Sequence, residues 1–275
     1  MRSVLLTLLL LLSTHVLQAR FLENVSLSGM YLQWGYNRDW YSKSTLHFKD
    51  GTNYDFTIHD AVAKDKPDFS AFRTNPLDIT IPQNSARLGF YLDKEHTHAI
   101  EINFDHAKYV VRDSQVLHVD GELRGRQIDK DTMITTNFVH FEHTNGANFC
   151  LLNYVGQHSF THNKRKNYAN TSVVWKAGAG VVIPRSYVIV MERYLDNVYH
   201  VAGYIVGAEA GLRYYPFKHL FLEGNIKNGF ANYRSVLGDA ATSRIHHHFW
   251  YAEVIGLVGY DIGFRKQKSP RGPVQ

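Results

Sequence analysis

The sequence predicts an all-β fold: an antiparallel up-and-down barrel of about 12 transmembrane strands that follows a cleaved leader. Three observations predict it. Apolar side chains alternate with small or charged ones, as on the two faces of a strand. The later segments run for about 10–15 residues, which suits a tilted strand that crosses a bilayer. Short turns alternate with longer polar connections, which predicts an even number of strands. Barrels of 10 or 8 strands would also meet this condition.

The N-terminus has the three parts of a secretory signal peptide. Met1 and Arg2 give a positively charged start, and residues 5–12 are almost pure leucine. Ala19 offers a small side chain at the cleavage point. No later segment approaches the roughly 18–20 apolar residues of a membrane-spanning helix. We therefore expect a leader over residues 1–19, a barrel over residues 20–264 and a basic tail over residues 265–275.

The composition excludes several classes of protein. The 275 residues are 44% hydrophobic and 13% aromatic, which is too apolar for a disordered chain. The single cysteine, Cys150, excludes a disulfide scaffold and a cysteine-rich metal site. The net charge of +5 is too mild to indicate nucleic-acid binding, although it is compatible with an anionic lipid surface.

The clearest strands lie in the last third of the chain, over residues 171–183, 202–214, 218–231 and 250–264. Each has one apolar face and one face that mixes glycine with charged residues. A soluble barrel would turn its apolar face inward. Because the charges here share a face with glycine, we expect them inside, with the apolar side chains against lipid. Aromatic residues near the ends of the apolar faces are expected to form the girdle at the membrane interfaces: Trp175, Tyr204, Tyr214, Trp250, Tyr260 and Phe264.

The earlier part of the chain supplies the remaining strands. Their expected ranges are residues 29–36, 43–49, 54–60, 86–92, 98–105, 116–123, 133–142 and 147–155. Short turns at residues 50–51, 93–96 and 215–218 are expected on the periplasmic side. The longer connections, residues 61–84, 184–199 and 233–248, are expected outside.

The face predicted to line the lumen carries both signs of charge. In the last third of the chain it holds Lys176, Glu209, Arg213, Glu223, Lys227, Glu253 and Asp261. The earlier segments add Lys43, Lys49, Asp55, Arg87, Glu101, Asp105, Asp120 and Glu122. A barrel of about 8–12 strands leaves little room for water, so charged side chains inside it are expected to pair. We therefore expect a filled lumen. A selective pore or a ligand cavity lined by the same charges is the alternative.

Residues 138–146 bring together groups that could perform chemistry. His140 and Glu142 share a strand face, and His143 precedes the hydroxyl of Thr144, as a base beside a nucleophile. The stretch resembles the His-x-Ser-Asn motif of outer-membrane lipid A deacylases, although the hydroxyl here directly follows the histidine and no paired acid is identifiable. Lipid A or phospholipid hydrolysis is therefore an alternative function with these four weak candidates, and no catalytic residue is assigned.

No metal or other cofactor is expected. The three consecutive histidines at residues 246–248 are the densest histidine cluster in the chain. Neighbouring residues on a strand point in opposite directions, so these side chains do not form a metal cup.

Four stretches resemble a family of outer-membrane β-barrel proteins common in Bacteroidota: residues 31–38, 101–106, 140–146 and 200–230. The resemblance covers nearly the whole chain after the leader. It implies a barrel in the outer membrane of a Gram-negative bacterium, in contact with outer-membrane lipids and lipopolysaccharide, and it transfers no active site. We expect a monomer without a nucleic-acid partner, with an envelope or structural role or a role in small-solute passage. A soluble periplasmic barrel that binds a ligand is a further alternative.

Overall fold

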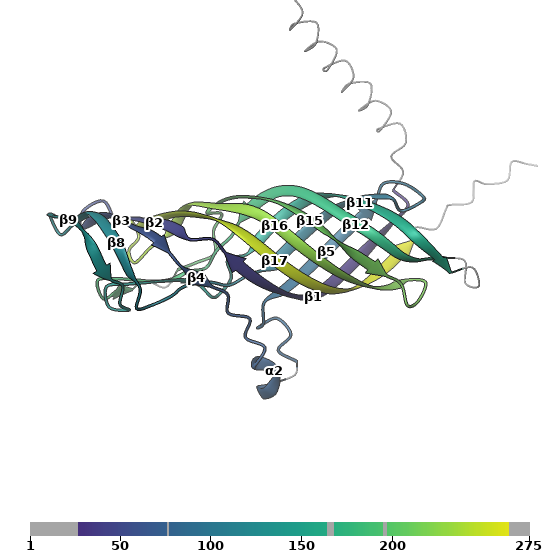
Figure 1. The fold of residues 1–275 in the computed structure, drawn as a ribbon, viewed down its shortest axis with the longest axis horizontal. Coiled ribbons are helices and arrows are strands. Elements are labelled where there is room, and N and C mark those ends of the chain that lie inside the picture. The colour runs from purple at the N-terminus through teal and green to yellow at the C-terminus, as the bar shows by residue number, and fades with distance from the viewer. Residues whose placement is uncertain (1–26, 76, 164–167, 195–196, 264–275) are drawn as a thin grey trace, which may run out of the picture.

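The chain closes into a β-barrel (Figure 1). The computed structural model describes residues 27–75, 77–163, 168–194 and 197–263. Within these residues the larger sheet has 12 strands, the predicted number, and an additional pairing of β1 (Gly29–Tyr41) with β17 (Arg244–Gly263) closes part of it into a ring. The ring contains eight of these strands: β1, β5 (Asn84–Tyr91), β6 (His98–His106), β11 (Phe149–Asn163), β12 (Tyr168–Val182), β15 (Gly203–Tyr214), β16 (Leu220–Leu237) and β17.

The remaining strands form an extension at one end of the ring (Figure 1). The larger sheet continues from the first residues of β17 into β2 (Ser44–Lys49), β3 (Tyr54–Ala61), β8 (Val116–Leu123) and β9 (Arg126–Met133). A second, five-stranded sheet consists of β14 (Arg193–Tyr194), β13 (Tyr187–Val190), β10 (Val139–His143), β7 (Tyr109–Val111) and β4 (Ala63–Lys64). The strand predicted over residues 133–142 is wrong, because β9 ends and β10 begins within it, in different sheets.

Helix is nearly absent from the part of the chain described. A short helix, α2 (Ala71–Thr74), lies in the connection between β4 and β5. No helix among the described residues is long and apolar enough to cross a membrane.

The end of the barrel opposite the extension, here called the terminal end, carries short turns. There Gly29 pairs with Gly263, and residues 92–97 and 215–219 join neighbouring strands (Figure 1). The sequence places the turn at residues 50–51 on this side as well, and that prediction is wrong. This turn joins β2 to β3 at the far end of the extension, where Lys49 pairs with the first residue of β17.

Backbone conformation and one carboxylate close the turn between β2 and β3. Gly51 has a φ of 87°, a left-handed conformation that favours glycine. The Asp50 carboxylate accepts the backbone N–H groups of Thr52 and Asn53 at 2.8 and 2.6 Å. This is the local hydrogen bonding by which aspartate initiates turns, and it also holds the pKa of Asp50 below its usual value, at about 2.

The strands of the ring and those of the extension turn their apolar faces in opposite directions. On β15 the charged Glu209 and Arg213 are buried inside the ring, whereas Leu212 is exposed outside. On β2 and β3 the apolar side chains are buried instead. The sequence prediction that places Lys43, Lys49, Asp55, Asp120 and Glu122 in the lumen is therefore wrong, since all five lie at the surface of the extension. The reason is that a second sheet covers these strands, so their apolar faces pack inward as in a sandwich.

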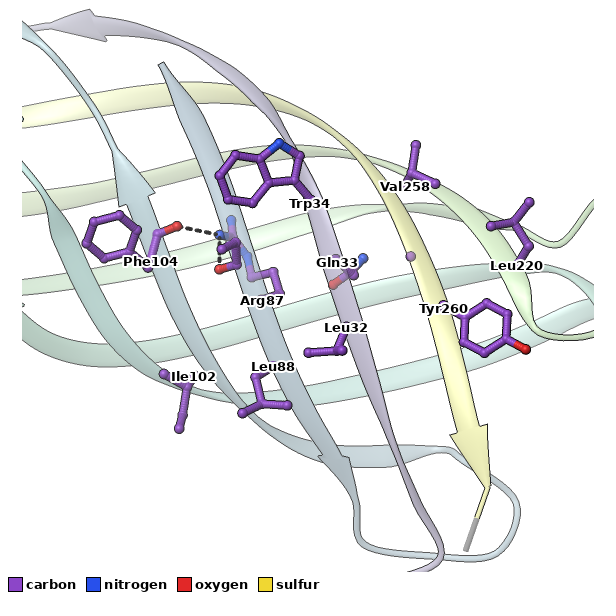
Figure 2. Close-up of a pocket in the computed structure, with 12 residues that line it drawn as sticks. Leu32, Gln33, Trp34, Arg87, Leu88, Ile102, Phe104, Leu220, Val258 and Tyr260 are labelled. Carbon is purple, nitrogen blue, oxygen red and sulfur yellow. Dashed lines mark hydrogen bonds between the residues drawn. The ribbon is translucent and has the colours of Figure 1, made fainter. Parts of the chain in front are cut away.

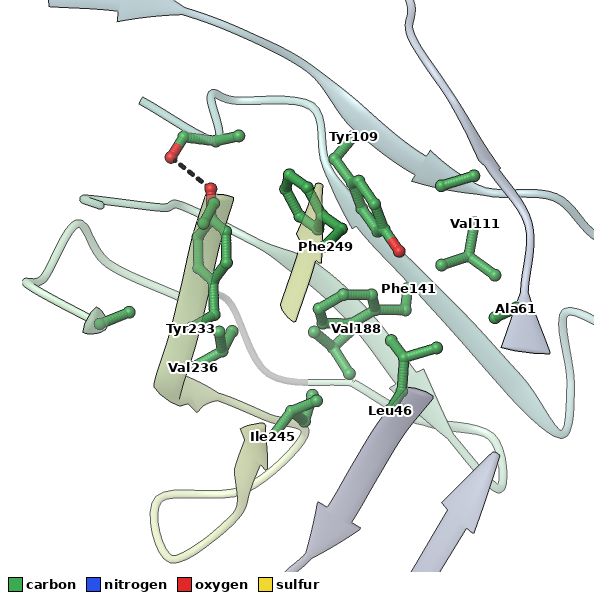
Figure 3. Close-up of a cluster of buried hydrophobic side chains, with 14 of the residues drawn as sticks. Leu46, Ala61, Tyr109, Val111, Phe141, Val188, Tyr233, Val236, Ile245 and Phe249 are labelled. Carbon is green, nitrogen blue, oxygen red and sulfur yellow. Dashed lines mark hydrogen bonds between the residues drawn. The ribbon is translucent and has the colours of Figure 1, made fainter. Parts of the chain in front are cut away.

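One apolar core fills the extension and continues into the barrel (Figure 3). Phe48 stacks on Phe56 with ring centroids 5.1 Å apart, and it meets Phe141 of the second sheet at 6.0 Å. Nearer the barrel, Phe149 and Tyr251 face each other at 5.0 Å inside the ring. The extension is thus a packed body joined to the barrel without a break in the core.

Replacing Phe48 with alanine should loosen the extension and leave the ring closed. Removal of a buried phenylalanine side chain costs about 3–5 kcal/mol. We expect faster limited proteolysis within residues 44–61, while the folded barrel band in unheated gel samples persists. Lys49→Ala, one residue away on the exposed face, is the matched control; it loses an exposed ion pair with Asp55 and should change stability by less than about 1 kcal/mol. Loss of the barrel band in the Phe48 variant would contradict the expectation that the ring stays closed when the extension loosens.

Candidate functional site

The lumen of the ring contains a layer of buried charged side chains, here called the charged layer. Its acids are Asp39, Glu101, Asp105, Glu209, Glu223, Glu253 and Asp261, and its bases are Arg87, Lys176, Arg213 and Lys227. The seven residues of the last third that the sequence analysis assigns to the lumen face all lie here. The layer is the largest concentration of charge inside the described part of the protein, and we take it as the first candidate site.

The register of the strands places opposite charges beside each other. Lys176 on β12 pairs directly with Glu209 on β15, and Glu209 pairs in turn with Lys227 on β16. Lys227 is paired with Glu253 on β17. Directly paired side chains on one face of an antiparallel sheet lie about 4.5–5.5 Å apart at Cβ. Four consecutive strands therefore carry alternating charge along one row of directly paired residues.

Lys176 is at the centre of the charged layer. Its Nζ atom lies 3.1 Å from Glu101 Oε2, 3.2 Å from Glu209 Oε1 and 2.8 Å from Glu223 Oε1. Neither Glu101 on β6 nor Glu223 on β16 is on a strand that neighbours β12, so this ammonium group reaches across the lumen. It thereby ties distant parts of the ring together.

The two arginines each hold a carboxylate at short range. Arg213 Nε donates to Glu223 Oε2 at 2.6 Å, and Arg87 Nη1 donates to Asp105 Oδ1 at 2.5 Å. Lys227 also donates to Asp105 from the other side. Hydrogen bonds between ionised partners are about twice as strong as neutral ones, which offsets part of the cost of burying the charges.

Acids outnumber bases in the charged layer, and neutral donors bind part of the surplus. Asp261 accepts hydrogen bonds from the hydroxyls of Tyr91 and Tyr215 at 2.8 and 2.9 Å. Asp39 accepts one from Gln83 Nε2 at 2.7 Å. Asp39 and these tyrosines are not among the residues that the sequence pattern assigns to the lumen. The alternation along β1 could have identified Asp39, because it shares an inward face with Gln33 and Asn37. The predicted strand, residues 29–36, ends before it.

An aromatic layer closes the lumen at the terminal end. Tyr31 and Phe221 flank Arg213, whose guanidinium carbon lies 4.7 and 4.2 Å from their ring centroids. A Cβ atom on Gly89 would lie 2.0 Å from the Tyr31 ring, and one on Gly259 would lie 2.2 Å from the Phe221 ring. Glycine therefore leaves the space that the rings fill. With the apolar core at the other end, the charged layer has packed side chains on both sides along the barrel axis.

The four weak catalytic candidates do not converge on one point. His140 and Glu142 lie on one face of β10, 3.6 Å apart, and Thr144 Oγ1 donates to Glu142 Oε1 at 2.9 Å. His143 lies on the opposite face, inside the core. Its Nδ1 atom is 2.7 Å from Ser186 Oγ, so the hydroxyl beside this histidine belongs to Ser186 rather than to Thr144.

His143 forms a buried pair with a second histidine. The Nε2 atoms of His143 and His247 are 3.1 Å apart, and the rings of Phe141 and Tyr233 enclose the pair. Burial lowers the pKa of His143 to about 3 and holds the pKa of His247 well below its usual value. The other two residues of the 246–248 run, His246 and His248, point outward. No group of three or more possible metal ligands is found among the described residues.

The outer face of the ring carries a shallow apolar groove of about 530 Å³ (Figure 2). It lies over β1, β5, β6 and β17, and its lining includes Leu32, Trp34, Ile102 and Val258. Figure 2 shows these side chains on the outside of the strands. Five of the residues expected in the aromatic girdle, Trp175, Tyr204, Tyr214, Trp250 and Tyr260, are also exposed on the outside of the ring, and Phe264 lies outside the described residues.

Comparison with known proteins adds three distant likenesses. No family model and no curated protein matches the chain. Neisserial surface protein A is 9% identical, with 86% of this chain and 98% of its own covered and a TM-score of 0.37. The outer membrane protein OprG from Pseudomonas aeruginosa is 11% identical, with 87% and 98% covered and a TM-score of 0.38. The outer membrane protease OmpT from Escherichia coli is 8% identical, with 87% and 98% covered and a TM-score of 0.34. Likenesses at these values define neither a family nor an activity for this chain.

Replacing Lys176 with methionine should strongly destabilise the barrel. The change leaves Glu101, Glu209 and Glu223 without their shared cation, and removing one partner of a buried ion pair costs about 3–5 kcal/mol. Urea unfolding in detergent micelles, followed by tryptophan fluorescence, would measure the loss. Lys49→Met breaks an exposed ion pair with Asp55 and serves as the control, with an expected change below about 1 kcal/mol. Equal effects of the two changes would contradict this account.

The buried histidine pair should make the extension sensitive to acid. On unfolding, both imidazoles return to a pKa near 6.5 and take up protons, so stability is present above about pH 6.5 and falls as the pH drops below it. Each histidine contributes up to about 1.4 kcal/mol per pH unit, and for His143 the loss levels off near its folded pKa of about 3.

Hydrogen exchange of the extension at pH 7.5 and at acidic pH, with each rate divided by the intrinsic rate at that pH, would show this loss as lower protection in β10 and the start of β17. The variant His143→Gln/His247→Gln should flatten the pH dependence, whereas His59→Gln, on an exposed histidine, should leave it intact. If the double variant keeps the same pH dependence, the histidine pair is not the cause of the acid sensitivity.

Proposed function

We propose that the protein is an integral outer-membrane β-barrel that conducts no solute and holds the extension at the cell surface. One observation carries this proposal: the same ring strands bury charge inside and expose apolar side chains outside. Leu212, Ile226 and Val258 are 55%, 60% and 51% exposed on the outer face. Hydrocarbon suits such a surface, and ring closure leaves these strands with no open edge, as a membrane requires.

The connections suggest which end faces which compartment. Bacterial barrels have short turns in the periplasm and longer segments outside. The short turns at the terminal end therefore favour a periplasmic position for that end, which puts the extension on the external side. In this placement the exposed aromatic residues Tyr214 and Tyr260 would belong to the periplasmic part of the girdle, and Tyr204 and Trp250 to the external part.

The packing of the lumen supports a structural or envelope role over small-solute passage. Ion pairs and hydrogen bonds occupy the middle of the lumen, and the aromatic layer and the apolar core lie to either side. A solute would have to displace Lys176 or Arg213 from the carboxylates that hold them. That displacement would leave buried charges without partners, which costs several kcal/mol.

The alternatives have less support. Hydrolysis of lipid A or phospholipid would need a base beside a hydroxyl that a substrate can reach. His143 and Ser186 are both buried within the core, and the Thr144 hydroxyl donates to Glu142 rather than to a histidine. A soluble periplasmic barrel would expose the apolar outer face of the ring to water. No observation favours either alternative as strongly as the buried charges and exposed apolar side chains of the ring favour a membrane barrel.

The rest of the proposal follows from the sequence pattern. It comprises a cleaved leader over residues 1–19, a basic tail over residues 265–275, and a monomer in contact with outer-membrane lipids and lipopolysaccharide. It also comprises membership of the Bacteroidota-type barrel family and the absence of a nucleic-acid partner. Support comes from the three-part leader, from the family resemblance and from the mild net charge of +5.

Spin labels in reconstituted vesicles test the placement of the ring. With Cys150 replaced by alanine, a label at Ile226 should collide more with oxygen than with a polar nickel complex, because it faces lipid. A label at Lys49, on the exposed face of the extension, should show the reverse. In planar bilayers the protein should give no stepwise conductance. Nickel access at Ile226 would place the ring in water, and discrete conductance steps would show an open lumen.

A further inference from the structure

A loop projects sideways from the wall of the barrel. Residues 65–83, the connection between β4 and β5 that contains α2, leave the wall beside β1 and point away from the barrel axis (Figure 1). We call this segment the side loop. The other large connections between ring strands fold into the extension, so the side loop is the part of the described chain that extends furthest sideways.

Polar contacts fix the base of the side loop to the barrel. Arg38 Nε, on β1, donates to Asp65 Oδ2 at 2.6 Å. Lys108 Nζ donates to Asp68 Oδ2 at 2.6 Å and to the carbonyl oxygen of Ile81 at 2.8 Å. These contacts hold both arms of the loop, so its sideways direction is built into the fold.

The side loop also packs on the outer face of β1. The ring of Tyr36 meets those of Phe69 and Phe72 edge to face, at centroid distances of 5.8 and 5.6 Å. The Tyr36 hydroxyl donates to the carbonyl oxygen of Ile79 at 3.3 Å. Tyr36 is the next outward position after Trp34, which lines the apolar groove of the ring. The side loop therefore continues the apolar outer surface of the barrel.

The side loop leaves the barrel wall within the outer half of the apolar band. From Met30 to Tyr36 a tilted strand rises by about 15 Å along the barrel axis, at about 3.3 Å per residue and a tilt near 40°. The apolar band of such barrels is about 25 Å tall. With Met30 near the periplasmic boundary, the loop leaves the wall in the outer half of the band, level with the outer leaflet.

Several apolar side chains of the side loop are exposed. Phe69, Leu77, Ile79 and Ile81 are 39%, 83%, 47% and 49% exposed. Their clustering on a projecting segment marks an interaction site rather than scattered surface residues.

The charges of this region that enter no ion pair among the described residues are mostly positive. Lys64, Lys66 and Arg73 are exposed and unpaired in this sense, whereas Asp65 and Asp68 are held by Arg38 and Lys108. The acid left over is Asp78, whose Oδ1 accepts a hydrogen bond from Asn75 Nδ2 at 2.9 Å. Basic residues near a membrane surface are attracted to anionic headgroups, with about 1 kcal/mol for each. The net positive charge therefore complements a phosphate-bearing lipid surface, next to exposed apolar side chains that suit acyl chains.

We propose that the side loop is a lipid-binding arm that lies in the outer leaflet. Phe69, Leu77, Ile79 and Ile81 insert among acyl chains, while the free basic residues face lipid phosphates. This arrangement is that of an interfacial anchor, with apolar groups below the headgroups and charge above. The proposal rests on the placement of the ring in the membrane described above.

A spin label at Ile79, in the Cys150→Ala background, tests the arm in vesicles of phosphatidylcholine with a minor share of phosphatidylglycerol. The label should collide with the nickel complex several-fold less often than a label at Thr52, in the exposed turn between β2 and β3. Adding Leu77→Ser and Ile81→Ser should raise nickel access at Ile79 toward the Thr52 level. The folded barrel band in unheated gel samples verifies that each variant has folded.

A label at Ile226 separates the two proposals. If Ile226 is shielded but Ile79 is as open to nickel as Thr52, the arm is wrong and the ring placement stands. If Ile226 is open as well, the ring placement fails. Shielding at Ile79 together with dipolar broadening between labels, lost on dilution with unlabelled protein, would mean that a second copy covers the exposed apolar side chains, and this would also overturn the lipid arm.

Discussion

A charge inside a narrow barrel needs an opposite charge or a hydrogen-bond donor within contact distance, because leaving water costs several kcal/mol for each ion. The register of the ring meets this requirement directly, since Lys176, Glu209, Lys227 and Glu253 alternate in sign across four neighbouring strands. Ring closure, the glycines beneath the aromatic layer and the tyrosine donors to Asp261 all serve the same layer. If the register moved by one residue, every one of these side chains would face outward.

The chain uses one alternating pattern for two opposite environments. In the ring the apolar face points out and the charges point in, whereas in the extension the apolar face meets a second sheet. The transition lies within β17, whose inward residues change from Glu253 to Phe249 and Ile245 toward the extension. What covers a strand, rather than its own sequence, decides which of its faces is buried.

Sequence reasoning recovered the features that depend on a single strand. The alternation in residues 202–214 and 218–231 identifies β15 and β16 and separates their charged faces from their apolar faces. It could not show that Lys49 and Asp55 belong to the extension, because this depends on the pairing of β2 with the start of β17, about 200 positions away in sequence. The same limit applies to His143, whose partners Ser186 and His247 come from distant segments.

The two longest strands carry a mechanical consequence. β16 and β17 have 18 and 20 residues and run from the terminal end into the extension, paired along most of their length. No flexible linker separates the two parts along these strands, so the extension cannot rotate relative to the barrel. A pull on the far end of the extension would load rows of backbone hydrogen bonds in shear, and anything that the extension touches is met at a fixed distance and angle from the barrel.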